Sequence, residues 1–452
     1  MTRRILCAIL KLALRIFFRH IEVAGLERVP ATGPVIFALN HPNGLVDPVF
    51  ILCLAPRRVS FLAKSPLFRM PVIGYLVRAL EAIPVYRRQD AGEDVSRNRE
   101  TFEKCRALLK SGGTIAICPE GVSHNEPRLL PLKTGAARIA LAAASSSNGE
   151  AFHLKIVPAG LYYTSKTTFR SAALLYFGAP VVVEPVTLKE DGEPPREAVR
   201  ALSDRIESAL RQVVLNAEHD EALATISRAE RIFSSVDQGA QGEGSKLARE
   251  LQLRRRFIEG YAFHRARSFE RLAALEARIR RYEEELKQAG LDLEDLSASE
   301  VSSGRLARYA LKRLLPFLLL SPLAAAGALL HYPAYRLAGF FATKFSYAAD
   351  DVVSTIKIIA AMLLFPLTWA GIAFICYALA GWKTALAALL LTPLAGYAAV
   401  IFSEELDRFS GGVKALAFFI RRRWFFLQLL AERRAIHEEI LALGDEAARE
   451  QG

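Results

Sequence analysis

Residues 34–48 read PVIFALNHPNGLVDP, and the rest of the chain is organised around this stretch. The run Val35–Leu39 is apolar throughout, which is typical of a strand that is buried on both faces. A polar corner with Gly44 and two prolines follows, so the strand should end close to His41. Binding and catalytic residues concentrate in such corners. The stretch therefore predicts a sheet whose edge presents His41.

Five residues separate His41 from Asp47, and the two side chains can meet if the chain turns between them. The carboxylate would then fix the tautomer of the imidazole and stabilise the imidazolium that forms when His41 accepts a proton. A turn or a cap without chemistry is the alternative for such a pair. No serine or cysteine nucleophile adjoins the pair in the sequence. The group to be activated is therefore expected to be the substrate's own hydroxyl, by direct transfer without a covalent enzyme intermediate or a metal.

Four later segments carry further polar residues. They read IPVYR at 83–87, CPEGVSH at 118–124, LLPLKTG at 129–135 and IVPAG at 156–160. Together with the first stretch, their order and spacing resemble the glycerolipid acyltransferase superfamily, whose members use acyl-CoA to acylate glycerol 3-phosphate and lysophosphatidate. The resemblance extends over roughly residues 20–215 and implies a membrane-bound acyltransferase of phospholipid biosynthesis.

Two departures from the commonest family pattern are informative. The commonest first motif has one residue fewer between His and Asp, and the commonest third motif continues Glu-Gly-Thr-Arg-Ser where this chain has Val122-Ser123-His124. Both departures resemble the fungal-type branch that acylates glycerol 3-phosphate or dihydroxyacetone phosphate at sn-1. That branch is the expectation here. The alternatives are sn-2 acylation of lysophosphatidate and a non-catalytic lipid-binding scaffold.

The resemblance also assigns residues to roles. His41 is expected to be the general base and Asp47 its orienting carboxylate. A guanidinium grips phosphate bidentately, and glycine lets backbone N–H groups approach an anion. The residues expected to bind the phosphate of the acceptor are Arg87, Glu120, Gly121 and Ser123. The residues expected to support the acyl-CoA, or to add charge, are Asn40, Lys64, Lys133 and Pro158; for Asn40 and Pro158 a purely structural role is the alternative. No cofactor is expected beyond acyl-CoA or another acyl thioester as co-substrate.

Residues 21–215 alternate apolar runs of strand length with longer segments of helical periodicity. The expected strands are Val35–Leu39, Val59–Ala63, Ile83–Tyr86, Thr114–Cys118, Ile156–Leu161 and Ala179–Glu184. The expected helices are Asp47–Leu54, Val72–Leu80, Glu93–Ser111, Gly135–Ala144 and Pro195–Val214. This alternation predicts an α/β fold with a mixed or largely parallel sheet flanked by helices.

The composition points to a membrane rather than to nucleic acid. Hydrophobic residues make up 52% of the 452 residues, charged residues 23%, and the net charge is +12. Basic residues beside apolar segments favour an anionic membrane surface, and no nucleic-acid-binding motif accompanies the charge. The five cysteines lack CxxC spacing, which argues against a zinc site and a disulfide framework. Small-molecule substrates and membrane lipid are the expected partners.

The chain is expected to divide into four parts. Residues 1–20 are expected to form an amphipathic helix at the membrane interface, or else a first core helix. The acyltransferase domain then covers 21–215, a charged helical segment 216–304, and a membrane region 305–452. Within the last, 358–379 and 384–402 are long enough for two spans, 314–330 carries two prolines and suits a re-entrant or interfacial segment, and 413–443 suits an amphipathic surface helix. Basic residues on both flanks of the hairpin place both ends, with the catalytic domain, on the cytoplasmic face.

Overall fold

The structure is a computed structural model of the 452-residue chain. It describes residues 2–90, 92–126, 128–145, 153–214, 229, 232, 260–261, 263–265, 267–291, 303–345 and 350–451. Much of the charged segment expected at 216–304 therefore lies outside the described residues. The chain forms two compact units. The described part of the first unit comprises 2–214 with 342–345 and 350–358, and the second contains the remaining helices.

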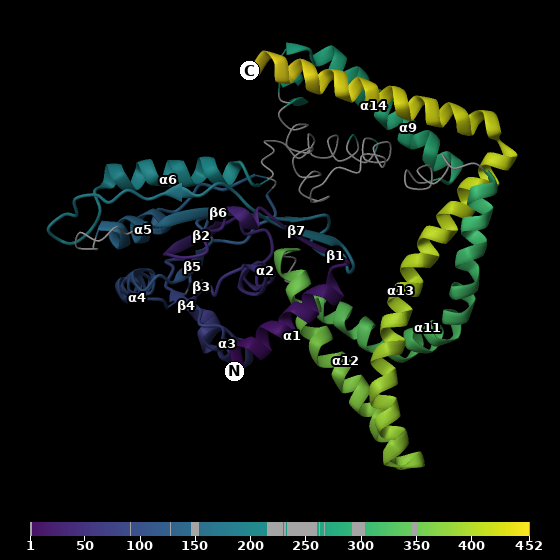
Figure 1. Ribbon diagram of the computed structural model, residues 1–452, viewed down its shortest axis with the longest axis horizontal. Helices are drawn as coiled ribbons and strands as arrows, with labels where there is room; N and C mark the ends of the chain where they lie inside the picture. The colour runs from purple at the N-terminus through teal and green to yellow at the C-terminus, as the bar shows by residue number, and fades with distance from the viewer. Residues whose placement is uncertain are drawn as a thin grey trace. The chain divides into compact units, whose positions relative to one another are not determined.

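The first unit is an α/β domain built on a single sheet (Figure 1). Its strands are β1 (His20–Ala24), β2 (Val35–Leu39), β3 (Ser60–Lys64), β4 (Ile83–Val85), β5 (Thr114–Ile117), β6 (Lys155–Tyr163), β7 (Ala172–Phe177) and β8 (Val181–Val182). Its helices are α1 (Thr2–Phe17), α2 (Val46–Leu54), α3 (Pro71–Ala79), α4 (Asn98–Lys110), α5 (Gly135–Ser145) and α6 (Arg196–Arg211). Short 3-10 turns occur at Leu26–Arg28, Ser65–Arg69 and Val95–Arg97.

The sheet is mixed, in the order β1-β7-β6-β2-β5-β3-β4, with β8 pairing to β6. Strands β6, β2, β5, β3 and β4 are mutually parallel, whereas β7 runs antiparallel to β6. Because parallel strands end at the same edge, the residues that follow β2, β3, β4 and β5 meet there. In open α/β sheets this carboxyl edge is where ligands bind.

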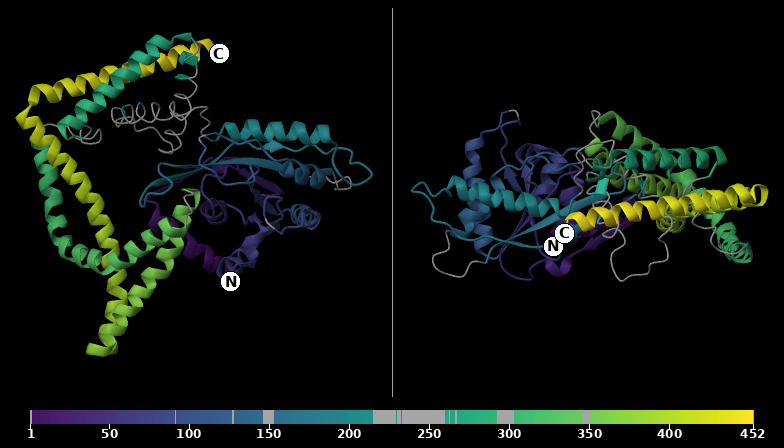
Figure 2. Two further views of the ribbon diagram at one scale, coloured as in Figure 1. Left: turned by 180° about the vertical axis from the view of Figure 1, so that it is seen from behind. Right: turned by 90° about the horizontal axis from the view of Figure 1, so that it is seen from above.

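The central strand β2 shows why helices cover both faces. All five of its side chains are buried. Ile36 and Ala38 belong to a core shared with α4, α5 and α6. Phe37 and Leu39 point the other way, into a core shared with α1 and α2, as the period-two alternation of a strand requires. Figure 2 shows α6 and α1 on opposite sides of the sheet. The predicted α/β class is confirmed.

The predicted elements match the structure at the centre of the sheet and differ at its edge. The strands β2 to β6 and the helices α2 to α6 all lie where the sequence predicts them, within a few residues. Two strands, β1 and β7, were not predicted. The strand expected at 179–184 is reduced to β8, which pairs with Lys155 and Ile156 at the start of β6, while β7 pairs with the rest of β6 from Ala159 to Tyr163.

Helix α1 has two faces. Leu14 and Phe17 are buried in the core of the sheet, while Ile5, Ile9 and Leu12 are exposed. The buried face agrees with a first core helix. The other face is apolar and exposed, and its place at a membrane interface stays a prediction.

The second unit is made of long helices. They are α9 (Phe269–Ala289), α11 (Ser303–Phe345), α12 (Asp350–Ala380), α13 (Trp382–Arg421) and α14 (Arg423–Gln451), with both ends of the α11–α12 connection belonging to the first unit. Within the part of the chain that the structure describes, two segments are long and apolar enough to cross a membrane, Thr355–Ala380 and Trp382–Leu406. Gly381 alone separates α12 from α13 and has a φ of +86°, a left-handed conformation that favours glycine.

A close contact joins α11 to α13. A Cβ atom on Gly327 would lie 1.9 Å from the carbonyl oxygen of Ala395, and one on Gly396 would lie 2.7 Å from the ring of His331. That ring also bonds the carbonyl of Gly327 and accepts from the indole N–H of Trp369 on α12, at 2.8 Å each. The segment 314–330 lies within the helix α11, whose Gly327 takes part in this junction; its re-entrant or interfacial placement stays a prediction.

Helices α9 and α14 lie side by side (Figure 1). The apolar positions predicted for α9 are buried, and most of them share a core with α14 through residues such as Phe426, Leu429 and Ile436. The helical spacing of Leu272, Leu275, Ile279, Tyr282 and Leu286 predicts this apolar stripe, and α14 covers most of it. The single amphipathic helix expected at 413–443 is divided at Arg422 between α13 and α14.

Candidate active site

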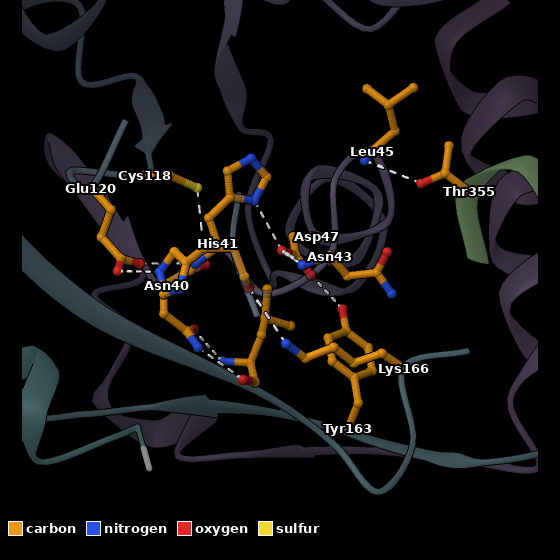
Figure 3. Close-up of polar contacts among 12 residues, drawn as sticks. Asn40, His41, Asn43, Leu45, Asp47, Cys118, Glu120, Tyr163, Lys166 and Thr355 are labelled. Atoms are coloured by element: carbon orange, nitrogen blue, oxygen red, sulfur yellow. Dashed lines mark hydrogen bonds and ion pairs between the residues drawn. The ribbon is translucent and has the colours of Figure 1, made fainter. Parts of the chain in front are cut away.

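His41 and Asp47 come together at the carboxyl end of β2. His41 lies in the corner after the strand, and Asp47 stands in the first turn of α2, so the intervening turn folds one side chain onto the other. The Nδ1 atom of His41 lies 2.9 Å from Oδ2 of Asp47. The Asp47 side chain is fully buried, and that of His41 is 17% exposed. The predicted His–carboxylate pair is present in the structure (Figure 3).

Asp47 is held from two further sides. The backbone N–H of Asn43 donates to Oδ2 at 2.7 Å, and the hydroxyl of Tyr163 donates to Oδ1 at 2.6 Å. Tyr163 ends β6 and packs between the rings of Phe18 and Phe50. Because these donors fill the remaining positions of the carboxylate, Nδ1 of His41 carries the proton and Nε2 is left as the acceptor. Nothing in the motifs marks Tyr163, which reads as one more aromatic residue of a buried strand.

The surroundings shift the acid–base properties of these groups. Burial alone lowers the pKa of His41, but contacts with Cys118 and Asp47 outweigh it and raise this pKa well above the ordinary value. Burial raises the pKa of Asp47, against the hydrogen bonds that favour its charged form. Burial, followed by the nearby Asp47, raises the pKa of Tyr163 well above its ordinary value, so the phenol stays a neutral donor. The site therefore contains a strong base held by a doubly supported carboxylate.

Cys118 lies beside His41, which the sequence did not anticipate (Figure 3). It follows β5, the strand next to β2, and its Sγ atom lies 4.0 Å from the carbonyl oxygen of Asn40. The expectation that no cysteine accompanies the pair is corrected, because adjacency arises from strand pairing and not from the sequence. Burial raises the pKa of the Cys118 thiol, although His41 acts against this shift. A raised pKa disfavours the thiolate, which is the nucleophilic form of cysteine.

Glu120 joins the loops that carry the site. Its carboxylate accepts from the backbone N–H of His41 at 3.1 Å, from that of Leu130 at 2.8 Å, and pairs with the ring of His124 at 2.5 Å. The N–H of His124 donates in turn to the carbonyl of His41 at 3.1 Å. Both oxygens of Glu120 are thus engaged within the protein. The geometry supports a positioning role for Glu120, and its direct contact with an acceptor stays a prediction.

Arg87 lies at the same edge, after β4. Its Nη1 donates to the carbonyl of Gly121 at 2.8 Å. Gly121 has a φ of +75°, a left-handed conformation that favours glycine, and Nζ of Lys133 lies 2.7 Å from where a Cβ would stand. Lys64 ends β3 and is in register with Val85 of β4. The structure thus gathers the three cations predicted for the acceptor or the CoA at one strand edge.

The remaining predicted residues occupy less direct positions. The amide of Asn40 both donates to the carbonyl and accepts from the N–H of Leu161, at 3.0 and 2.7 Å, which is the turn-supporting alternative. Pro158 is buried within β6, in register with Ala38, and does not end the strand. Ser123 is half-buried in the loop between Gly121 and His124. A contact of Ser123 or Pro158 with substrate stays a prediction.

The start of α12 contacts the loop that carries the pair. The N–H of Leu45 donates to Oγ1 of Thr355 at 3.2 Å, and Nζ of Lys357 donates to the carbonyl of Thr167 at 2.7 Å. Ile358 packs on the core that contains α1 and α2. The first candidate membrane span begins at Thr355. One end of this apolar helix is therefore fixed at the candidate site.

Two family models match the chain. Residues 20–162 match the Acyltransferase model, and residues 239–448 match the model of the Glycerol-3-phosphate acyltransferase 2 C-terminal domain. The first range contains the whole site described above, and the second contains helices α9 to α13 and most of α14.

Three curated yeast proteins are similar to the chain. An uncharacterized acyltransferase of Schizosaccharomyces pombe is 26% identical over 88% of this chain and 73% of its own length. Glycerol-3-phosphate O-acyltransferase 2 of Saccharomyces cerevisiae is 28% identical over 60% of this chain and 37% of its own length. Glycerol-3-phosphate O-acyltransferase 1 of the same yeast is 26% identical over 78% of this chain and 58% of its own length. The chain thus spans less than two thirds of the length of each of these two glycerol-3-phosphate O-acyltransferases.

Proposed function

The chain belongs to the glycerolipid acyltransferase superfamily and is similar to its fungal glycerol-3-phosphate branch, and from this premise we propose its reaction. The protein transfers an acyl group from acyl-CoA to the sn-1 hydroxyl of glycerol 3-phosphate or dihydroxyacetone phosphate. The observation that carries the proposal is the buried pair of His41 and Asp47, joined at 2.9 Å on the strand edge that also gathers Arg87, Lys64 and Lys133.

In the proposed mechanism His41 acts as general base. Its Nδ1–H donates to Asp47, so Nε2 accepts the proton of the acceptor's hydroxyl as the oxygen attacks the thioester carbon. The C–O bond forms, the C–S bond breaks, and the proton on Nε2 passes to the departing CoA thiolate. Asp47 stabilises the imidazolium between these two proton transfers. Atoms and charge balance without a further reactant.

Direct transfer is proposed even though Cys118 lies beside His41. A covalent route would require the thiolate, and burial raises the pKa of this thiol. The alternative is testable because Cys118→Ala removes the sulfur and leaves the pair of His41 and Asp47 intact. Under direct transfer the variant keeps most of its turnover, and no acylated Cys118 is found by mass spectrometry after incubation with acyl-CoA. Loss of turnover together with a trapped acyl-cysteine in the wild-type protein would replace this mechanism.

Arg87 is proposed to bind the phosphate of the acceptor. A guanidinium offers paired donors that match phosphate geometry. Losing a hydrogen bond to a charged group costs about 1.5–3 kcal/mol, so Arg87→Ala should raise the acceptor's KM about tenfold or more. The KM of acyl-CoA should stay nearly unchanged. Equal effects on both substrates would move Arg87 away from the acceptor.

The membrane is proposed as the place of action. Two helices are apolar enough to cross it, and the first of them begins where Thr355 contacts the loop of the pair. This arrangement suits an enzyme whose acylated product partitions into lipid. With Lys and Arg on both flanks of the hairpin, both of its ends and the catalytic domain are proposed to face the cytoplasm.

The test uses the full chain, purified in detergent. Incubation with palmitoyl-CoA and glycerol 3-phosphate is expected to give a mono-acylated product with the chain at sn-1, identified by mass spectrometry. His41→Ala should give none while retaining the unfolding midpoint of the wild type. Wild-type turnover in His41→Ala would refute the base assignment. Absence of product with glycerol 3-phosphate, dihydroxyacetone phosphate and lysophosphatidate alike would refute the proposed function and favour the non-catalytic alternative.

A further inference from the structure

Arg87 is already bound by a carboxylate of its own loop. Its Nε donates to Oδ2 of Asp90 at 2.8 Å, and its Nη2 donates to Oδ1 at 2.7 Å. This side-on, two-bond geometry is the one in which a guanidinium recognises a carboxylate or a phosphate. The third contact, from Nη1 to the carbonyl of Gly121, fixes the plane of the guanidinium. The bidentate edge of Arg87 is therefore occupied by Asp90.

Asp90 also lies among the other cations of the strand edge. Arg87 makes the largest contribution to lowering the pKa of Asp90 below its ordinary value, against burial, and Lys64 and Lys133 add to it. Lys133 is fixed nearby, with Nζ close to the position that a Cβ on Gly121 would take. The side chains of Arg87 and Asp90 are 21% and 12% exposed, so the pair lies at the surface of the site and solvent reaches it. One carboxylate thus stands where three cations converge.

The segment that carries Asp90 is a loop. It follows β4, which ends at Val85, and precedes the turn at Val95–Arg97. The N–H of Asp90 donates to the carbonyl of Arg87 at 3.1 Å, closing a turn, and Gly92 has a φ of +74°. A carboxylate on such a loop can leave Arg87 by rotation of its side chain, without any change in the sheet.

We propose that Asp90 stands in for the acceptor's phosphate on Arg87, and that the acceptor binds by displacing this carboxylate. The inference rests on the proposed function for the identity of the acceptor. A phosphate dianion interacts with three cations more strongly than a carboxylate does, so it can replace Asp90. A small anion gains less from the exchange, because it lacks the glycerol hydroxyl that reaches His41. Asp90 thereby weakens the binding of inorganic phosphate and favours the complete acceptor.

A role in which Asp90 only orients Arg87 predicts the opposite change in phosphate affinity. If Asp90 only orients Arg87, its removal loosens the guanidinium and weakens phosphate binding. If Asp90 competes with phosphate, its removal strengthens binding. Since the pair is partly exposed, the gain from Asp90→Asn is expected to be about three- to tenfold in affinity. Asp90→Ala should act in the same direction and leaves no amide to contact Arg87.

The experiment is a titration of the purified full chain with inorganic phosphate, in which calorimetry or ³¹P NMR measures the binding. Asp90→Asn should bind phosphate about three- to tenfold more tightly than the wild type, and Arg87→Ala should lose the binding. The matched control is Asp94→Asn, which removes the same charge from the same loop at a side chain that bonds Ser96 instead. This control should bind phosphate as the wild type does.

Kinetics supply the second readout. Asp90→Asn should lower the KM of glycerol 3-phosphate and leave the KM of acyl-CoA unchanged. The ratio of the inhibition constant of inorganic phosphate to the KM of glycerol 3-phosphate should become smaller than in the wild type. Equal or weaker phosphate binding by Asp90→Asn and Asp90→Ala would overturn the inference, as would an absence of phosphate binding by every variant. Because the titration requires no acyl transfer, failure of the proposed function would show separately, as absence of product in the wild type.

Discussion

At the scale of single residues, the account depends on how one buried carboxylate is shared. Asp47 accepts from His41 and Asn43 in the corner after β2, and from Tyr163 at the end of β6. The ring of His41 gains a fixed tautomer from this arrangement; burial lowers its pKa, but contacts with Cys118 and then Asp47 raise it above the ordinary value. Asp47→Asn tests what the carboxylate contributes to catalysis, and Tyr163→Phe tests what its hydrogen-bond donor contributes.

The first residue-scale prediction concerns pH. A general base must be unprotonated, so the rate should rise as pH increases through the pKa of His41, which lies above the ordinary value of about 6.5. Asp47→Asn removes one cause of the raised pKa and should move this limb of the kcat/KM profile to lower pH. General-base catalysis contributes about 10²–10⁴-fold, so the maximum rate should fall by about 10²-fold or more. An active Asp47→Asn with an unmoved limb would show that Asp47 does not act on the base.

The second residue-scale prediction concerns Tyr163. Tyr163→Phe keeps the packing against Phe18 and Phe50 and removes the hydrogen bond to Asp47. An unpaired buried acceptor costs about 1–3 kcal/mol, so kcat should fall by about tenfold. The KM of the acceptor should be unchanged, because Tyr163 acts through Asp47. The matched control is Tyr176→Phe on β7, which removes a hydroxyl that accepts from Arg28 outside the site and should keep its kcat. A similar loss in both variants would assign the effect to stability.

The sequence motifs contain residues that the structure brings together, but they do not show the residues that support them. His41, Asp47, Arg87 and Gly121 lie in short motifs with recognisable spacing, and all four meet at the strand edge. Tyr163 and Cys118 reach the site because β6 and β5 flank β2. Adjacency of that kind arises from strand order, which a single sequence does not state. Glu120 was predicted as a ligand of the acceptor, yet its oxygens bind loops of the protein.

At the scale of elements, the local sequence pattern predicts which segments form strands and helices, but it does not predict which distant segments pack together. The strand β2 and the helices around it follow from apolar runs and periodicity. β7 has a similar apolar run, yet the strand predicted from the sequence lies after Gly178 instead. Short apolar runs do not by themselves distinguish a strand from a buried helical segment. The stripe on α9 was predicted correctly, whereas its partner α14, more than a hundred residues away, was not. Pattern shows which face is buried but leaves its partner undefined.

The element-scale prediction concerns the junction of α11, α12 and α13. Gly327→Ala would bring a Cβ to 1.9 Å from the backbone of Ala395, so the helices must separate. Overpacking costs about 1–3 kcal/mol, and the helical unfolding transition in detergent should move to lower temperature. Gly371→Ala, on α12 with no neighbouring atom within 4 Å, is the control and should leave the transition unchanged. Equal transitions in the two variants would mean that α11 and α13 do not pack closely in solution.

At the scale of the whole molecule, the reacting groups and an apolar helix converge on one loop. The loop between His41 and Asp47 also contacts Thr355, the first residue of a candidate span. The sequence placed the domain boundary at residue 215 and the membrane region far beyond it. The compact unit that holds the site also includes residues 350–358, because the first turns of α12 pack on it. This connection depends on tertiary contact and has no local signature.

The central claim is that a small, unacylated phosphate is the acceptor. The most direct measurement is a competition assay in which the purified protein receives palmitoyl-CoA with glycerol 3-phosphate, dihydroxyacetone phosphate and lysophosphatidate at equal concentrations. The ratio of products gives the ratio of kcat/KM values. We expect glycerol 3-phosphate or dihydroxyacetone phosphate to be acylated at least about tenfold faster than lysophosphatidate, a difference of about 1.4 kcal/mol. A preference for lysophosphatidate would contradict the account.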